Sequence, residues 1–413
     1  MSNSQQKLPC FRSLWQLGGI KSLLATALAF SALAESPVIS HGEETLNPPG
    51  QIRIVGDGAN GKLEVFDNSA SYSQVVAMNE RGAVLGVREL LGPEVGMRTL
   101  AYFYSEGERL LDMPQLEGYT NVEGQAVSND GKVVGYASRA MGHRDGSLAA
   151  VVWDTQTGKI SELGTLPNDH VSHAQDISQD GKRIVGYSTA AEAFKVRPCL
   201  WSWNETTEHW DVSALPTIED SNPFLITGGT VISPDGKRIA ACITFKIHPG
   251  NRFDSSLYAW NLSEKGEWLR QEVSAESGVM RDLNNRGEMA VSMGSNHGLV
   301  PVRVNLEGEI TIIDLLPGDE SGEARAITAT GAIFGLSNDP AGPEGGPQAF
   351  VAKGSQAEVL KLHPSSLYSA AYAVNDRGQI AGLLDVEVPN ENAGEGEPAV
   401  LEKTLGFRWT PKN

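Results

Sequence analysis

Cysteine is scarce in this sequence, with three among 413 residues. Cys10 lies close to the N-terminus, so Cys199 and Cys242 are the two that can belong to a folded domain. Both lie within apolar, strand-like stretches, and two cysteines are too few for a disulfide scaffold. A single disulfide between them is one alternative, but buried free thiols are the preferred interpretation.

Positive charge is also in short supply, because 33 Lys and Arg residues face 51 Asp and Glu residues and give a formal net charge of −18. A chain this acidic repels phosphate backbones and offers no surface that would release counterions. Nucleic acid is therefore excluded as a partner. Anionic membrane surfaces are disfavoured for the same reason.

Long hydrophobic runs are missing as well. The apolar run at residues 23–30 is well short of the ~20 residues that cross a bilayer. Basic residues precede it, and Ala32-Leu33-Ala34 follows it, which is the order of a secretory signal peptide. We therefore predict a signal peptide at residues 1–34, a flexible linker at residues 35–50, and a secreted or periplasmic protein without membrane insertion.

The common catalytic motifs are absent: there is no HExxH, no GxSxG and no Walker loop. Residues 56–61 satisfy GxGxxG, but a strand-like stretch follows where a dinucleotide site needs a helix, so a hairpin turn is predicted. Asp57, Asn60 and Asp67 fit a calcium loop only in fragments. We predict no catalytic, cofactor-binding or metal-binding residues and no cofactor.

One pair of histidines, His170 and His173, lies close together in the sequence, with Asp169 and Asp176 beside it. Two imidazoles and a carboxylate could hold zinc. Residues three apart need not share a face of a strand-linking loop, however. We predict that both histidines are polar loop residues without a metal.

A hairpin signature recurs seven times and has Asn, Ser or Thr three residues before a glycine. The copies occupy residues 77–82, 126–131, 176–181, 231–236, 282–287, 326–331 and 373–378. The glycines are 49, 50, 55, 51, 44 and 47 residues apart. The side-chain oxygen can start a tight turn, and the glycine supplies a positive φ at its close.

Each turn is followed by a short apolar strand, a variable loop and a third strand, and several units close with a fourth strand. Four short strands in each ~45 to 55 residues predict the blade of a β-propeller. The third strands often end in an aromatic residue, as at Trp153, Trp201, Trp260 and Trp409. These side chains could stack on sugars, but their equivalent positions favour packing between blades.

The seventh unit lacks a fourth strand, and residues 61–66 near the N-terminus have the pattern of the fourth strand at residues 158–163. We therefore predict an all-β, seven-bladed β-propeller as a single domain over residues 51–413. It is closed by pairing of the N-terminal strand with the C-terminal blade. Residues 52–55 compete with residues 407–409 for the third-strand place in that blade.

Residues 162–166 and 172–188 resemble the HAF-type extracellular repeat of bacterial secreted proteins, whose unit runs dLGtLgG, S-x-A-x-x-I-N, G-q-V-V-G-y-s and HAF-x-W. The likeness extends over residues 73–413 and is strongest in the second and third units. The sequence His-Ala-Phe itself is absent, and residues 348–350 (Gln-Ala-Phe) come nearest to it. The resemblance implies an exported, propeller-like protein and carries no catalytic residues with it.

The loops between the second and third strands are long and variable, and functional residues gather on such loops. The fourth of them combines basic and aromatic side chains, in contrast to the acidic chain as a whole. We predict a binding patch there, made of Phe245, Lys246, His248, Arg252 and Phe253.

Three functional classes remain. The preferred hypothesis is a non-catalytic, monomeric binding module for protein or glycan, because no acid, base and nucleophile converge in the sequence. The alternative is an extracellular carbohydrate-active enzyme, a glycosidase or lyase, with acids from distant blades at the central channel. A passive structural repeat is the third. Whether acids line the channel mouth discriminates among them.

Overall fold

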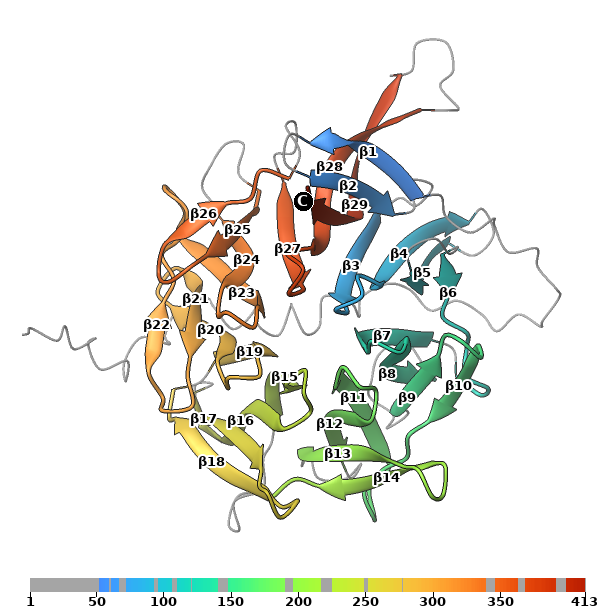
Figure 1. Ribbon diagram of the computed structural model, residues 1–413, viewed down its shortest axis with the longest axis vertical. Coiled ribbons are helices and arrows are strands. Elements are labelled where there is room, and N and C mark those ends of the chain that lie inside the picture. Colours follow the sequence, from blue (N-terminus) through green and yellow to red (C-terminus); the bar gives the residue numbers. More distant parts are fainter. Residues whose placement is uncertain are drawn as a thin grey trace, which may run out of the picture.

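The computed structural model describes residues 52–412 except residues 59–60, 67–71, 93–95, 106–109, 120, 140–147, 190–195, 217–224, 249–251, 277, 339–345, 363–367 and 391–398. The predicted signal peptide and linker lie outside the described residues. Every regular element in the described part is a β-strand. Seven antiparallel sheets are arranged around one axis (Figure 1), which confirms the predicted seven-bladed propeller.

In the first six blades the strands run from innermost to outermost in chain order, and the first three strands of the seventh blade do the same. The innermost strands are β3 (Tyr72–Met78), β7 (Asn121–Val127), β11 (Val171–Ile177), β15 (Leu225–Ile232), β19 (Gly278–Leu283), β23 (Ser321–Ile327) and β27 (Ser369–Val374). The second strands are β4 (Val84–Gly92), β8 (Lys132–Ser138), β12 (Arg183–Thr189), β16 (Arg238–His248), β20 (Met289–Ser295), β24 (Ile333–Asn338) and β28 (Ile380–Pro389).

The third strands are β5 (Gly96–Tyr104), β9 (Leu148–Asp154), β13 (Val196–Asn204), β17 (Arg252–Leu262), β21 (Gly298–Val304), β25 (Gln348–Ala352) and β29 (Val400–Pro411). The outer strands of the first six blades are β6 (Leu111–Asp112), β10 (Lys159–Glu162), β14 (His209–Ala214), β18 (Trp268–Ser274), β22 (Ile310–Ile312) and β26 (Ala357–Val359).

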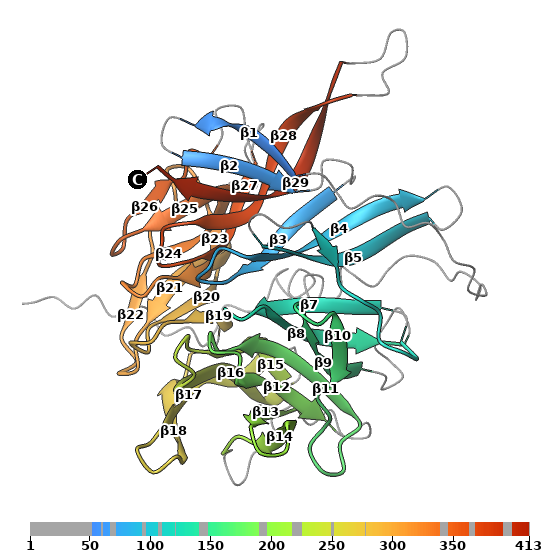
Figure 2. The same cartoon turned by 45° about the vertical axis from the view of Figure 1, so that its right-hand side comes forward.

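The seventh blade takes its outer strands from the N-terminal end of the described chain (Figure 2). β2 (Gly61–Phe66) pairs antiparallel with β29, so that Leu63 lies opposite Trp409. β1 (Ile52–Gly58) pairs with β2 and forms a fifth, outermost strand. The predicted closure is thereby confirmed, and the competition for the third-strand place is settled in favour of residues 407–409. The antiparallel pairing of β1 with β2, in which Gly58 lies opposite Gly61, confirms the predicted hairpin.

Seven clusters of buried apolar side chains hold the ring together, one in each interface between neighbouring blades. Trp201, for example, is fully buried against Val134 and Val152 of the preceding blade. Its indole Nε1 donates a hydrogen bond to the Gly164 carbonyl, 3.3 Å away. Trp260 is buried in the same way one blade further. The aromatic residues therefore pack between blades, as predicted.

The two cysteines of the described chain are free and buried, which confirms the interpretation as buried thiols. Burial raises the pKa of Cys242 to about 11 and that of Cys199 well above its usual range. Both thiols are therefore protonated and chemically inert at neutral pH.

The seven hairpin turns share one geometry. In each, the glycine has a positive φ, between 68° and 84°. Its N–H donates to the carbonyl of the Asn, Ser or Thr three residues earlier, as from Gly181 to Ser178. The side-chain oxygen of that residue accepts a further N–H bond, as from Arg183 to Ser178 Oγ at 3.0 Å. The recurring sequence signature is thus explained by the turn that it builds.

No helix within the described ranges is long and apolar enough to cross a membrane.

Candidate functional site: the axial channel

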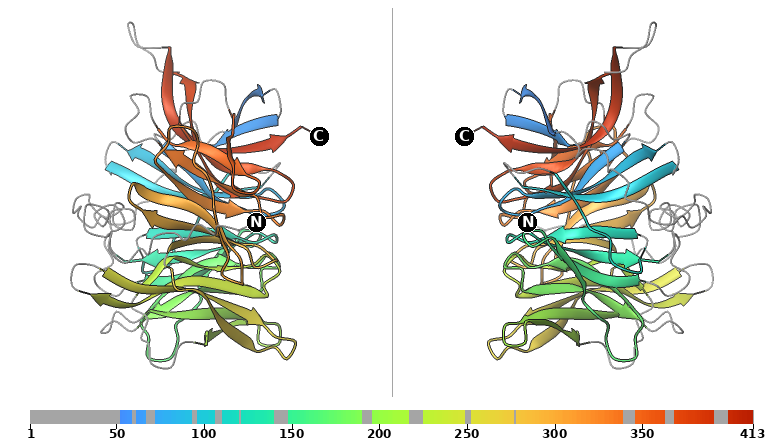
Figure 3. Two further views of the ribbon diagram at one scale, coloured as in Figure 1. Left: turned by 90° about the vertical axis from the view of Figure 1, so that its left-hand side faces the viewer. Right: turned by 90° about the vertical axis from the view of Figure 1, so that its right-hand side faces the viewer.

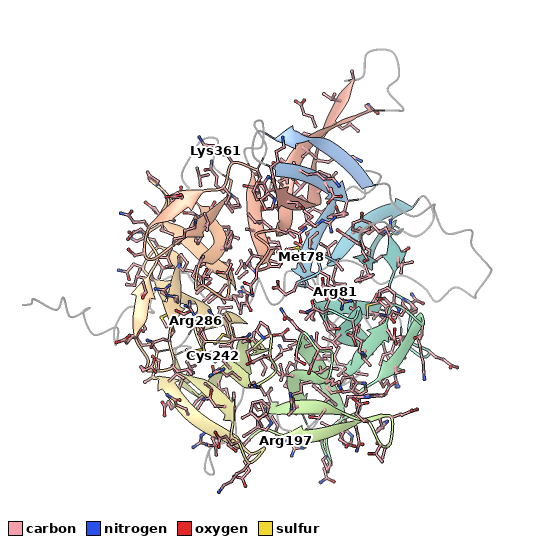
Figure 4. All side chains as sticks on the ribbon, in the orientation of Figure 1. Met78, Arg81, Arg197, Cys242, Arg286 and Lys361 are labelled. Carbon is pink, nitrogen blue, oxygen red and sulfur yellow. The ribbon has the colours of Figure 1, made fainter. Side chains whose placement is uncertain are left out.

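The seven innermost strands line the axis of the molecule, and each contacts the innermost strand of the next blade. A partly exposed side chain on such a strand reaches water through the channel that a propeller has along its axis. Figure 4 shows Met78 and Arg81 near the axis, at the end of β3 and in its turn, whereas Arg197 lies toward the rim. The channel wall is therefore built by residues of one strand from each blade.

Every innermost strand is irregular at the same place in the blade, and in six of the seven a β-bulge leaves one residue without a partner on the second strand. In six blades the unpaired residue is Val76, Gln125, Gln175, Arg281, Arg325 or Tyr372. The fourth blade has a wider irregularity, between Thr227 and Thr230. A bulge re-aims a side chain, and these six are all partly exposed.

Sequence reasoning missed these channel residues. The signal that could have found them is positional, because each of the six lies three residues before the Asn, Ser or Thr of the hairpin turn. The recurring turn signature begins one residue after this position, so the signature itself does not mark these side chains.

The turn mouth of the channel is encircled by hydrogen bonds that join each hairpin turn to the next. All seven junctions have at least one such bond. They run from Asn79 Nδ2 to the Ser128 carbonyl, Asn129 N to the Gln179 carbonyl, Gln179 N to the Pro234 carbonyl, Asp235 N to Asn285 Oδ1, Asn284 Nδ2 to the Thr328 carbonyl, Ala329 N to Asp376 Oδ1, and Asn375 Nδ2 to the Asn79 carbonyl. We call this closed set of bonds the turn belt.

Two aspartates beside the turn belt form additional hydrogen bonds between neighbouring blades. Asp176 accepts N–H groups from Ile177 and from Ile232 of the next blade, both at 2.8 Å. Asp282 accepts N–H groups from Leu283 at 2.7 Å and from Ile327 of the next blade at 2.8 Å. Each carboxylate therefore uses both oxygens to tie two blades together.

Burial raises the pKa of both carboxyl groups, that of Asp176 to about 7 and that of Asp282 to about 6. The charge of Asp282 contributes to the shift of Asp176, and the charge of Asp376 contributes to that of Asp282. Burial also raises the pKa of Glu80, which accepts the Asp376 N–H at 3.0 Å. Acids do line this mouth of the channel, but they are engaged by the backbone.

The raised pKa of Asp176 predicts a pH dependence of stability. The folded state binds this proton more tightly than the unfolded state does, so its contribution is fully present below about pH 4 and is lost as the pH rises through about 7. Asp176→Asn should flatten the fall of the unfolding free energy between pH 5 and pH 8, by at most about 1.4 kcal/mol per pH unit. Denaturant titrations across this range measure the slope.

Asp211→Asn is the matched control, because Asp211 is exposed on the outer strand β14, where its carboxylate accepts a hydrogen bond from the Asn204 side chain at 2.8 Å. This control should keep the wild-type slope. An Asp176→Asn variant with that same slope would contradict the assignment.

Two arginines of neighbouring blades meet in the channel wall. Arg281 Nη2 lies 3.1 Å from Glu323 Oε2, and Arg325 Nη2 lies 2.8 Å from the same oxygen. The Arg325 guanidinium also lies over the Tyr372 ring, 4.9 Å from its centroid. The Nε atoms of both arginines are buried and have no hydrogen-bond partner. Burial, together with the nearby positive charge of Arg325, lowers the pKa of Arg281 to about 10.

The expectation that His173 is a loop residue is wrong. His173 lies in β11, half-buried between two tyrosines. Its Nδ1 is 3.2 Å from the Tyr187 hydroxyl, and its ring meets the Tyr136 ring edge to face. Burial raises the pKa of Tyr187 to about 12. The spacing of the two histidines gives no indication that His173 belongs to an innermost strand, two residues before the bulge of that strand.

His170 is exposed and precedes β11, so the two histidines do not converge on one site. In the part of the chain that the structure describes, no group of three His, Cys, Asp or Glu side chains could hold a metal ion.

The predicted binding patch of Phe245, Lys246, His248, Arg252 and Phe253 does not lie on a loop. All five residues belong to the long antiparallel hairpin of β16 and β17, where His248 is opposite Arg252 and Ile247 is opposite Phe253. Because β16 and β17 remain paired as far as His248 and Arg252, the loop that the sequence predicts at this place is replaced for the most part by strands. β4 and β5 form a second long hairpin, whose pairing continues as far as Gly92 opposite Gly96. These hairpins leave the blades at the mouth opposite the turn belt (Figure 3).

The chain is similar to several solved structures, the first of which supports the propeller fold. The β-propeller domain of the Trilobed protease from Pyrococcus furiosus, described as having an open velcro topology, aligns with a TM-score of 0.50 and 12% identity over 81% of this chain and 94% of that chain. TolB from Acinetobacter baumannii aligns with a TM-score of 0.40 and 13% identity over 80% of each chain.

The uncomplexed acylaminoacyl peptidase from Pyrococcus horikoshii has a TM-score of 0.48 and 10% identity over 82% of this chain, which spans 52% of that enzyme. No family model and no curated protein matches the sequence. At these identities the likeness concerns the fold alone.

Proposed function

We propose that this chain is a non-catalytic, secreted or periplasmic propeller that binds protein or glycan. Export rests on the order of basic, apolar and small residues before Glu35 and on the resemblance to the HAF-type repeat of secreted proteins. A binding role rests on the fold, because a rigid ring presents a broad face and a polar channel to a ligand.

The observation that carries the choice of binding over catalysis is the state of the channel acids. A glycosidase needs two carboxylates that face the substrate from ~5 to 9.5 Å apart. Asp176 and Asp282 instead accept backbone N–H groups on both of their oxygens. Their arrangement accounts for the joining of blades, and neither of these two carboxylates is free to act on a substrate.

The test is a glycan array probed with the exported chain, followed by calorimetric titration of whichever glycan binds. Gln125 is a partly exposed, neutral channel residue whose side-chain amide can bond a ligand. Gln125→Ala should weaken binding roughly threefold to tenfold, the value of one or two hydrogen bonds. Glu264→Ala, on an exposed turn at the rim, is the control and should bind like the wild type.

The hairpin of β16 and β17 stays a predicted contact of the same ligand. A double Lys246→Ala, Arg252→Ala variant tests it in the same titration. Loss of affinity in this variant alone, with Gln125→Ala unchanged, would move the binding surface from the channel to the hairpins. Absence of any bound glycan, together with no captured extracellular protein, would contradict the binding role.

A further inference from the structure

We propose that Arg281 and Arg325 form an oxyanion-binding site in the axial channel, which takes a carboxylate or phosphate group of the ligand. This inference rests on the proposed binding role and specifies the chemistry that the channel recognises. The two residues lie at the bulge positions of β19 and β23, the innermost strands of two adjacent blades.

The first argument is the local balance of charge. Two guanidinium groups share one carboxylate oxygen, Glu323 Oε2, at 3.1 and 2.8 Å. The other nearby acid, Asp282, directs its two oxygens to the N–H groups of Leu283 and Ile327. The arginine pair therefore lacks one negative charge at short range. An incoming oxyanion supplies it.

The second argument is the unused hydrogen-bond capacity. The Nε–H groups of Arg281 and Arg325 are buried and without a partner. Buried N–H donors are almost always satisfied, and arginine cannot shed its proton to escape the cost. Because the Nε atoms themselves are closed off from solvent, an incoming oxyanion is met by the terminal nitrogens of the two guanidinium groups, which suit carboxylate and phosphate oxygens. The wall thus carries donors of the type that oxyanions need.

The third argument is the way the two groups are held. The side chains are about a fifth exposed, with 23% for Arg281 and 21% for Arg325, so they are fixed by the wall yet open to the channel. The Tyr372 ring supports the Arg325 guanidinium from the next blade. Two cations kept close together around the single carboxylate of Glu323 make a local positive site within an otherwise acidic chain.

The experiment measures thermal unfolding of the exported chain with inorganic phosphate or with glucuronate, against sodium chloride of equal ionic strength and against glucose. At about 50 mM anion we expect a rise in Tm of about 2 to 4 °C over the chloride and glucose references. A rise with phosphate alone assigns the site to phosphate, and a rise with glucuronate alone assigns it to carboxylates.

Variants with opposite expected effects on anion affinity distinguish an anion-binding site from an ion-pair network that only stabilises the fold. Arg325→Gln should remove the rise in Tm, and Arg325→Lys, which keeps the charge but loses the fork, should reduce it. Glu323→Gln removes the internal competitor and should tighten binding about tenfold in calorimetry. A purely structural ion-pair network would instead lose stability in all three variants without an opposite change in anion affinity.

Arg286→Gln is the matched control, because Arg286 is an exposed arginine of the same blade that pairs with Glu288. It should keep the wild-type response. The inference is overturned if neither anion raises the Tm of the wild type, or if Arg325→Gln and Glu323→Gln change the response in the same direction. Capture of a neutral glycan without any response to oxyanions would overturn this site and leave the proposed binding function standing.

Discussion

Removal of residues 51–70 should abolish the cooperative unfolding of this protein and cause it to aggregate. β2 supplies Leu63, Val65 and Phe66, each at most 2% exposed, to the interfaces of the closing blade. Burial of three such side chains contributes about 5 to 8 kcal/mol. Their loss is comparable to the ~5 to 15 kcal/mol that holds a whole domain folded.

The deletion also breaks a buried ion pair. Glu64 Oε2 accepts hydrogen bonds from Arg408 Nε at 2.8 Å and Arg408 Nη2 at 2.5 Å. The Arg408 guanidinium also donates a hydrogen bond to the Gly82 carbonyl in the turn of the first blade. Removal of one partner from a buried pair costs about 3 to 5 kcal/mol.

Thermal circular dichroism and size-exclusion chromatography measure the outcome. Removal of residues 51–58 alone is the control, since it takes away β1 and leaves β2 paired with β29. This shorter deletion should retain a cooperative, monomeric transition. If the longer deletion melts at the same temperature as the complete protein, closure by β2 does not stabilise the ring.

Gly186→Ala should destabilise the protein by about 3 kcal/mol or more. A Cβ at this position of β12 would overlap the His173 carbonyl oxygen on the innermost strand, opposite the bulge. Gly135, Gly335 and Gly382 meet a first-strand carbonyl in the same way. The contact is between backbone atoms, so only a shift of the strands can relieve it.

Gly158→Ala separates this close approach from the effect of backbone conformation. Gly158 has a φ of 73° and nothing within 4 Å of the added Cβ. Its substitution should cost about 1 kcal/mol, from the left-handed conformation alone. Urea unfolding of both variants measures the difference, and equal losses would contradict the steric account.

The fold was predictable because the same turn signature recurs seven times in the sequence. The glycine of each turn and the Asn, Ser or Thr before it specify a hairpin locally, and their regular spacing gives the number of blades. Even the closing strand could be found, since residues 61–66 repeat the pattern of a fourth strand. These features depend on residues that are neighbours in the sequence.

The channel was not predictable in the same way. Arg281 and Arg325 are 44 residues apart, and only the bulges of β19 and β23 direct them toward one carboxylate. His173 was misplaced because its environment, Tyr136 and Tyr187, comes from the second strands of two different blades. Contacts across blade interfaces arise from the closed ring and have no signal within a single repeat.

The most direct test of the proposed function is the recovery of a bound glycan after long incubation with the protein. We expect mass spectrometry to find the glycan unchanged in wild-type samples and in Asp176→Asn samples alike. The reason is that Asp176 and Asp282 accept hydrogen bonds from backbone N–H groups. Accumulation of cleaved or eliminated products in proportion to the wild-type protein, lost in Asp176→Asn, would contradict a non-catalytic binding role.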